Sequence, residues 1–200
     1  MTGGLWRLGG HVVLVCSVTV AVSAVSGLTR ELAALCAEKV ETITQVTHDG
    51  PEPRRTVLSE SEVNSWLRFV AVDKVPAGLT ELAVSFVGDG RVSGRAVVDL
   101  DVLGRRKIGG GLLDPWRYLT GRVPVMAHGT LLTGQGVGRF VMESASIGGV
   151  SVPKVVIQDL VGFYLRSPSR PHGVSMDDPF ALPAGIDELE VGPGEAVVIQ

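Results

Sequence analysis

Glycine-containing turns between runs of alternating apolar and polar residues constrain the fold of this chain more than any other feature. Such alternation is typical of strands that bury one face, and a turn such as Asp89-Gly90 joins two of them into a β-hairpin. Three pairs of segments fit the pattern: 82–86 with 92–101, 123–133 with 137–147, and 186–191 with 196–200. Hairpins join antiparallel neighbours, so the sequence predicts an antiparallel sheet built from hairpins.

The alternation also assigns side chains to the two faces of a strand. Within 137–147 it places Val141 and Ala145 on one face, and Phe140 and Met142 on the other. Both faces of this strand therefore carry apolar residues, and we expect both to be covered.

Three further segments carry apolar residues three or four positions apart, which is the spacing of one helix face. They span residues 28–46, 60–70 and 152–165. Ser59 and Glu62 begin the second as a capping box, in which each side chain accepts a hydrogen bond from a free backbone N–H. Helices together with hairpins predict an α+β fold, with amphipathic helices covering one face of the sheet.

The N-terminal residues have the pattern of an export signal. Arg7 precedes an apolar run of 14 residues, 12–25, which is typical of the central region of a signal peptide. The charge-free stretch of 22 residues, 8–29, is also long enough to span a membrane. The sequence therefore leaves two interpretations open, a cleaved signal peptide and a retained membrane anchor.

Both interpretations place the rest of the chain outside the cytoplasm. We expect residues 1–27 to be the signal peptide or N-terminal membrane anchor, and residues 28–200 to form a single α+β domain. This domain would be periplasmic or anchored to the inner membrane. Cys16 lies in the leader and Cys36 beyond it, so a cleaved protein has no partner for a disulfide. We expect Cys36 to act as a small apolar residue on a helix face.

The sequence contains no complete catalytic or metal-binding motif. The four histidines are scattered, and neither a Gly-x-Ser-x-Gly elbow nor a dinucleotide-binding glycine motif is present. Asp99 and Asp101 are expected to share one strand face, and His128 to lie on another strand, where solvated surface positions are the simplest interpretation. With 18 basic and 21 acidic residues, the net charge is −3, which excludes a strongly basic nucleic-acid binder. We therefore expect no cofactor, no metal and no enzymatic activity.

One segment departs from this charge balance. Residues 91–122 contain seven basic and three acidic residues. Arg105, Arg106 and Lys107 form a basic cluster with Trp116 close behind, a combination that suits contact with anionic headgroups at a membrane surface. A solvated loop is the alternative interpretation of the same residues.

A resemblance to known proteins adds to this interpretation. The segment LSESEVNSWL at 58–67, followed by VPAGLTELAVSFVGDGRVSGRAVVDLD, resembles LmeA-like and YpmS-like exported bacterial domains of the tubular lipid-binding (TULIP-like) superfamily. Asn64 is its most specific match. The resemblance implies a curved sheet and helices that enclose a long apolar groove for lipid acyl chains, and it assigns no catalytic role to any residue.

We therefore expect a non-enzymatic lipid-binding or lipid-transfer domain of the bacterial cell envelope, with a phospholipid or other acyl lipid as ligand. Its apolar residues are mainly valine, leucine and alanine, which suit the walls of such a groove. The candidate lining residues are Trp66, Leu67, Val84, Phe86, Val98, Leu100, Val156 and Leu160. The alternative is a membrane-anchored structural or interaction module with a fully packed core and a protein partner.

Overall fold

The computed structural model describes residues 27–45, 52–105, 121–164 and 175–200. Residues 1–26 of the predicted leader lie outside these ranges, as do Arg106, Lys107 and Trp116 of the basic segment. Within the described ranges, no helix has the length and apolar character needed to cross a membrane.

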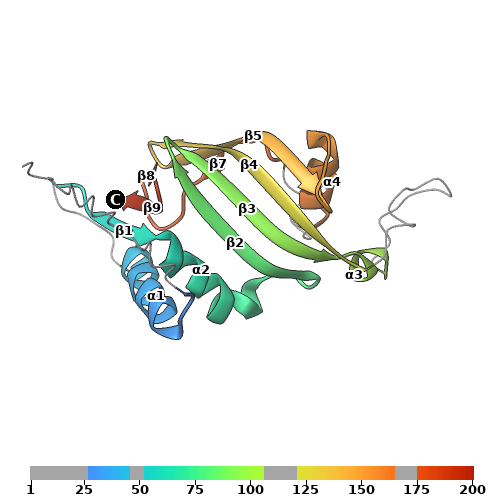
Figure 1. Ribbon diagram of the computed structural model, residues 1–200. Coiled ribbons are helices and arrows are strands. Elements are labelled where there is room, and N and C mark those ends of the chain that lie inside the picture. Colours follow the sequence, from blue (N-terminus) through green and yellow to red (C-terminus); the bar gives the residue numbers. More distant parts are fainter. Residues whose placement is uncertain (1–26, 46–51, 106–120, 165–174) are drawn as a thin grey trace, which may run out of the picture.

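The described chain has an α+β fold, as predicted (Figure 1). The helices are α1 (Arg30–Gln45), α2 (Glu60–Phe69), the short 3₁₀ helix η1 (Ala71–Lys74), α3 (Leu100–Arg105) and α4 (Lys154–Tyr164). The strands are β1 (Arg55–Ser59), β2 (Leu79–Gly88), β3 (Arg91–Asp99), β4 (Arg122–Gly134), β5 (Val137–Ile147), β6 (Val150–Ser151), β7 (Phe180–Ala181), β8 (Glu188–Gly192) and β9 (Glu195–Ile199).

The strands form two sheets in which every neighbouring pair is antiparallel. The large sheet has six strands in the order β2-β3-β4-β5-β6, with β7 also paired to β5, and it does not close into a barrel. The small sheet has the order β1-β9-β8. All three predicted hairpins are present: β2–β3 and β4–β5 in the large sheet, and β8–β9 in the small one.

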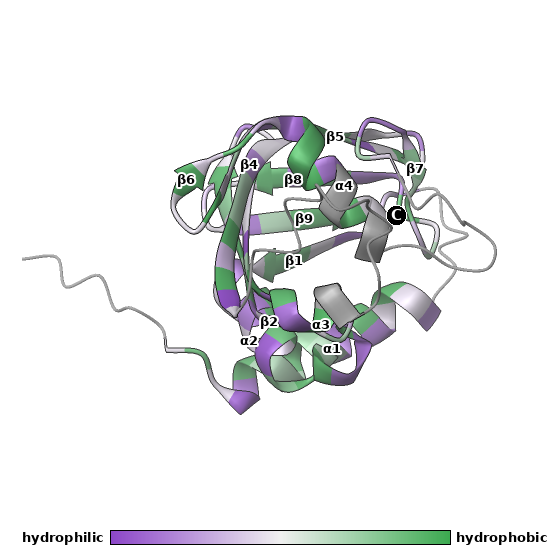
Figure 2. Cartoon of the chain, turned by 90° about the vertical axis from the view of Figure 1, so that its right-hand side faces the viewer, coloured by the Kyte–Doolittle hydropathy of each residue, from purple (hydrophilic) through white to green (hydrophobic). Residues whose placement is uncertain are grey.

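The long strands β2 to β5 form a curved layer, and the small sheet lies against one end of it (Figures 1 and 2). The junction is hydrogen-bonded. Thr133 Oγ1 of β4 lies 2.9 Å from both the backbone N and O of Leu189 in β8. Gly194 N donates to Phe86 O in β2 at 2.8 Å. The small sheet is therefore fixed to the large one at this end.

Strand β1 had no signal in the sequence, because no hairpin turn connects it to its partner. It pairs with β9, about 140 residues later in the chain, so that Arg55 lies opposite Ile199. Strands β6 and β7 have two residues each, which is too short for alternation to appear.

The predicted strand position of Asp101 is wrong, because β3 ends at Asp99. Asp99 Oδ1 accepts hydrogen bonds from the backbone N of Asp101 at 3.0 Å and of Val102 at 3.1 Å. This is the arrangement of a helix N-cap, and it begins α3 at Leu100. Asp99 is therefore occupied in starting a helix and does not form a pair of carboxylates with Asp101 on one strand face.

The predicted faces of β5 also need correction. Ser144 lies opposite His128, but the next pair joins Met142 to Gly129, so Glu143 is an extra residue in a β-bulge. The bulge reverses the alternation. Phe140 and Met142 therefore share the face of Ala145 and Ile147 instead of lying on the opposite one.

The buried apolar core lies beside the small sheet. Its centre is a cluster of four residues from α1, the segment around β7, and β9: Ile43, Leu182, Ile186 and Val198. The cluster adjoins the large sheet through Gly138, where an added Cβ would lie 2.6 Å from the ring of Phe180 and 3.2 Å from Leu182 Cδ2. This end of the molecule is filled by its own side chains.

Candidate functional site

One face of the large sheet is apolar along β2, β3 and β4. The strand pairing sets Val84 opposite Gly94, Gly94 opposite Ala127, Ala96 opposite Val125, and Val98 opposite Val123. Directly opposed residues of antiparallel strands project from the same face. These side chains are aliphatic or absent, so the surface they form has neither charge nor hydrogen-bonding groups beyond the backbone.

A groove of about 440 Å³ lies over this face, and we call it the apolar groove. Residues of β2, β3 and β4 form its floor, and residues of α2, α4 and the segment after α4 contribute to its walls. Its lining is Leu67, Pro76, Leu79, Leu82, Ala83, Val84, Gly94, Arg95, Ala96, Val98, Val125, Ala127, Ile157, Val161 and Met176. Arg95 is the single charged residue in this lining, and its pairing with Ala83 directs its side chain to the other face of the sheet.

Small residues on the floor explain why space remains there. Gly94 has no atom within 4 Å of the position that a Cβ would occupy, and Ala96 and Ala127 lie beside it in the sheet. Among the residues whose side chains the structure describes, no aromatic one contributes to the lining. The groove is therefore an opening that the chain's own described side chains leave unfilled.

Three of the eight residues predicted to line a groove do so: Leu67, Val84 and Val98. Three others lie outside the lining: Trp66, Phe86 and Leu100. The Lys74 ammonium lies 5.6 Å from the ring centroid of Trp66, and Leu100 is buried at the start of α3.

On α4, the lining residues are one position later than predicted. Ile157 and Val161 contribute to the groove, whereas Val156 does not, and the side chain of Leu160 is outside the description. The apolar residues of α4 cover most of its circumference, so their spacing did not identify the inner face. Met176 had no sequence signal, because it follows the helix in a segment predicted as a loop.

The predicted headgroup contacts are only partly described. Arg105 ends α3, at the end of the large sheet remote from the small sheet (Figure 1), and its side chain is outside the description. Arg106, Lys107 and Trp116 lie beyond it in the undescribed segment, so the structure places none of these side chains.

Helix α2 is attached to the edge of the sheet by side-chain hydrogen bonds. Asn64 Nδ2 donates to Val84 O and Asn64 Oδ1 accepts from Val84 N, both at 2.8 Å. Glu60 Oε2 accepts from Phe86 N at 2.8 Å. β2 is an edge strand, and these side chains bond backbone groups that a further strand would otherwise pair. Asn64 therefore has a structural role that sequence reasoning did not find.

The segment after α4 is held against that helix by two polar contacts. Lys154 Nζ forms an ion pair with Asp177, and Met176 N donates to Gln158 Oε1 at 2.7 Å. These contacts bring Met176 into the lining of the apolar groove.

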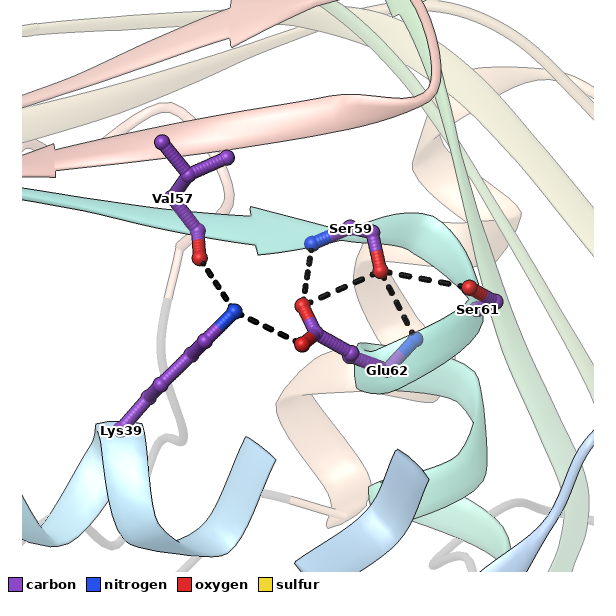
Figure 3. A network of polar contacts seen from close by, with 5 residues as sticks. All are labelled: Lys39, Val57, Ser59, Ser61 and Glu62. Carbon is purple, nitrogen blue, oxygen red and sulfur yellow. Dashed lines mark hydrogen bonds and ion pairs between the residues drawn. The ribbon is translucent and has the colours of Figure 1, made fainter. Parts of the chain in front are cut away.

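The buried end of α2 carries a polar network (Figure 3). Glu62 Oε1 lies 2.7 Å from Lys39 Nζ, and Glu62 Oε2 accepts from the backbone N of Ser59 at 2.8 Å. Lys39 also donates to Val57 O at 2.9 Å. Burial by itself would raise the pKa of Glu62, but the hydrogen bonds from Lys39 and Ser59 outweigh it and hold the pKa below the ordinary 4.5. The network fixes α1, β1 and α2 together, and it contains the predicted capping box.

Cys36 lies close to this network and is 1% exposed. Burial, aided by the nearby Glu62 carboxylate, raises the pKa of its thiol to about 11. The side chain therefore acts as a small packed group and not as a reactive thiolate at neutral pH.

The described residues offer no arrangement for proton transfer or metal binding at the groove. No group of three His, Cys, Asp or Glu side chains able to hold a metal occurs among them. His128 pairs with Ser93 and Ser144, which places it on the face opposite the groove. The site as described can bind an apolar molecule by excluding water from it.

No protein-family model, no curated protein and no solved structure matches this chain.

Proposed function

We propose that this chain is a non-enzymatic lipid-binding or lipid-transfer domain of the bacterial cell envelope, and that it holds acyl chains in the apolar groove. The observation that carries the proposal is the groove itself, which has a volume of about 440 Å³ and is uncharged at fourteen of the fifteen described residues that line it. This volume lies within the range of about 300–1,000 Å³ typical of small-molecule sites. In this proposal, α2 and α4 cover the apolar face of the sheet as amphipathic helices and complete the walls.

Acyl chains fit the chemistry of this lining better than other ligands. A polar ligand would lose hydrogen bonds to water, and the lining offers few groups to replace them. An alkyl chain loses none, and each buried CH₂ contributes about 0.8 kcal/mol. Affinity should therefore increase by roughly fourfold per added methylene until the groove is full.

The place of action follows from the leader. Its apolar run supports export, and the resemblance to exported lipid-binding domains agrees with it. A domain outside the cytoplasm, beside a membrane, has access to the phospholipids that the groove would accept.

The experiment is native mass spectrometry of the protein purified from cells, followed by titration with saturated fatty acids of increasing length. We expect co-purified lipid and an affinity that increases with chain length. Ala127→Phe would fill part of the groove and should weaken binding. His128→Phe, the adjacent residue on the opposite face, is the matched control and should bind normally. A protein that is free of lipid and binds no fatty acid would support the packed structural module instead.

A further inference from the structure

A second hollow adjoins the apolar groove at edge strand β2. It has a volume of about 550 Å³ and is lined by residues of α2, η1, β2 and β3, and we call it the edge pocket. It shares five lining residues with the groove: Leu67, Leu79, Leu82, Ala83 and Arg95. The two spaces therefore adjoin each other at one short part of β2.

At this part of β2 the strand is irregular. The pairing with β3 passes from Thr80–Val97 directly to Ala83–Arg95, which leaves a bulge at Glu81 and Leu82. Glu81 has a φ of 53°, which is uncommon for a residue with a side chain. Bulges and positive-φ residues are frequent beside binding sites, where they change the direction of a strand.

The bulge is fixed by a residue of β4. One terminal nitrogen of Arg122 lies 2.8 Å from Thr80 Oγ1 and 3.2 Å from Glu81 Oε1. The ion pair compensates the Glu81 carboxylate, the single acidic group in the lining of the edge pocket.

The remaining charges of the edge pocket are positive. Arg68 and Arg95 both line it and are exposed. Arg95 makes no hydrogen bond or ion pair with any residue that the structure describes, and the Arg68 guanidinium lies 5.8 Å from the ring centre of Phe69. Arg122 does not line the pocket but pairs with Glu81, so the charges of Arg68 and Arg95 are left without an acidic partner in the described lining. The edge pocket therefore favours an anionic group beside an uncharged groove.

We propose that the edge pocket binds the anionic headgroup of the same lipid whose acyl chain occupies the apolar groove, with Arg68 and Arg95 as the headgroup contacts. This inference rests on the proposed function and specifies its ligand class: a lipid with a phosphate or carboxylate headgroup. Guanidinium groups bind phosphate and carboxylate oxygens through paired N–H donors, and a flexible arginine at the surface reorients to do so. In this proposal the headgroup and the acyl chain meet beside the bulge at Glu81 and Leu82, where the two cavities share lining residues.

In the experiment, the full-length protein is incubated with mixed vesicles of phosphatidylglycerol and phosphatidylcholine that have identical acyl chains. Mass spectrometry then measures the ratio of the two lipids that the protein extracts. We expect roughly tenfold enrichment of phosphatidylglycerol. Both headgroups carry a phosphate, but the quaternary ammonium of phosphatidylcholine offsets that charge and is repelled by the two arginines. The double variant Arg68→Gln and Arg95→Gln should lose this preference and still extract lipid. Arg139→Gln, the control, removes one positive charge from an exposed position outside both cavities and should retain the preference.

The outcomes separate this inference from the proposed function. Lipid extraction without a headgroup preference, or a preference that survives in the double variant, would overturn the headgroup site alone. A wild-type protein that extracts neither lipid would overturn the proposed function. Excess inorganic phosphate should leave the preference intact, and its loss would show that the pocket binds free anions and not lipid headgroups.

Discussion

The apolar face of the large sheet is covered differently at its two ends. Near the small sheet, the rings of Phe140 and Phe180 lie over Gly129 and Gly138, each 2.6 Å from where a Cβ would be. Over β2 and β3, Gly94 of the same face has open space above it. Strand glycines therefore have two opposite functions in this fold, since they accommodate aromatic rings at one end and leave a groove at the other.

The two ends are also held together by different forces. The end near the small sheet is stabilised by a buried apolar cluster that includes Ile43 and Val198. At the groove, α2 is attached to β2 by the hydrogen bonds of Asn64 and Glu60. An apolar cavity can persist in such a structure because its walls are fixed by directional polar bonds and do not depend on packing across it. One sheet therefore has a packed, stabilising end and an open end that carries the apolar groove.

The largest expected effect comes from a matched pair of leucines. Leu182→Ala, in the buried cluster, should lower the free energy of unfolding by about 2–5 kcal/mol because it leaves a cavity. Leu82→Ala, in the lining of the groove, should cost roughly 1 kcal/mol, because this side chain is half-buried beside an existing opening. Urea unfolding measures both values. Equal losses would show that the two ends are packed alike.

The polar attachment of α2 provides the next test. Asn64→Ala removes the side-chain hydrogen bonds to both the backbone N and the backbone O of Val84. It should lower the free energy of unfolding by roughly 2–3 kcal/mol. Glu60→Gln keeps an acceptor oxygen for Phe86 N, and we expect little change in the same unfolding experiment. If Asn64→Ala left the free energy of unfolding unchanged, apolar contacts alone would hold α2 on the sheet.

The two kinds of glycine should respond oppositely to the same substitution. Gly129→Ala places a methyl group against the Phe140 ring and the Val141 carbonyl oxygen, and should destabilise the fold by about 1–3 kcal/mol. The Cβ added by Gly94→Ala has no atom within 4 Å. This substitution should leave the free energy of unfolding unchanged or raise it by up to about 1 kcal/mol. Thermal unfolding of both variants checks the difference, and a destabilised Gly94→Ala would contradict an open groove.

The Glu62 network adds a pH dependence to the packed half. The pKa of the Glu62 carboxyl is lowered in the folded state. The charged carboxylate therefore contributes fully to folding stability above pH 4.5, and this contribution is lost as the pH falls through the folded-state pKa. Glu62→Gln should lower stability by about 1–2 kcal/mol at pH 7, and this difference should shrink toward pH 3. Denaturant unfolding across this range gives the comparison. A difference that stays constant with pH would show that the carboxylate charge contributes nothing.

Local signals predicted the parts of the fold that depend on neighbouring residues. The Asp89-Gly90 turn and the Ser59–Glu62 capping box each act within a few residues, and both appear as expected. The bulge at Glu143 depends on how β5 pairs with another strand, so alternation within β5 alone assigned Phe140 to the wrong face.

The candidate site shows the same division. Leu67, Val84 and Val98 follow clear apolar patterns, and the structure brings them into one groove. Asn64 bonds to a residue 20 positions later, and its polar side chain gave no indication of the strand edge that it meets. The inner face of α4 is fixed by contact with the sheet and could not be read from a helix that is apolar on most sides.

The most direct test of the central claim, that the open end binds acyl chains, is the affinity for palmitate of Gly94→Leu compared with the wild-type protein. The added side chain projects into the open space at Gly94 and displaces about four methylenes of ligand. At fourfold per methylene, binding should weaken by roughly 250-fold while thermal stability is maintained. Ser93→Leu, one residue earlier and on the opposite face, should bind palmitate normally. Unchanged affinity in Gly94→Leu would contradict the account and place any lipid elsewhere.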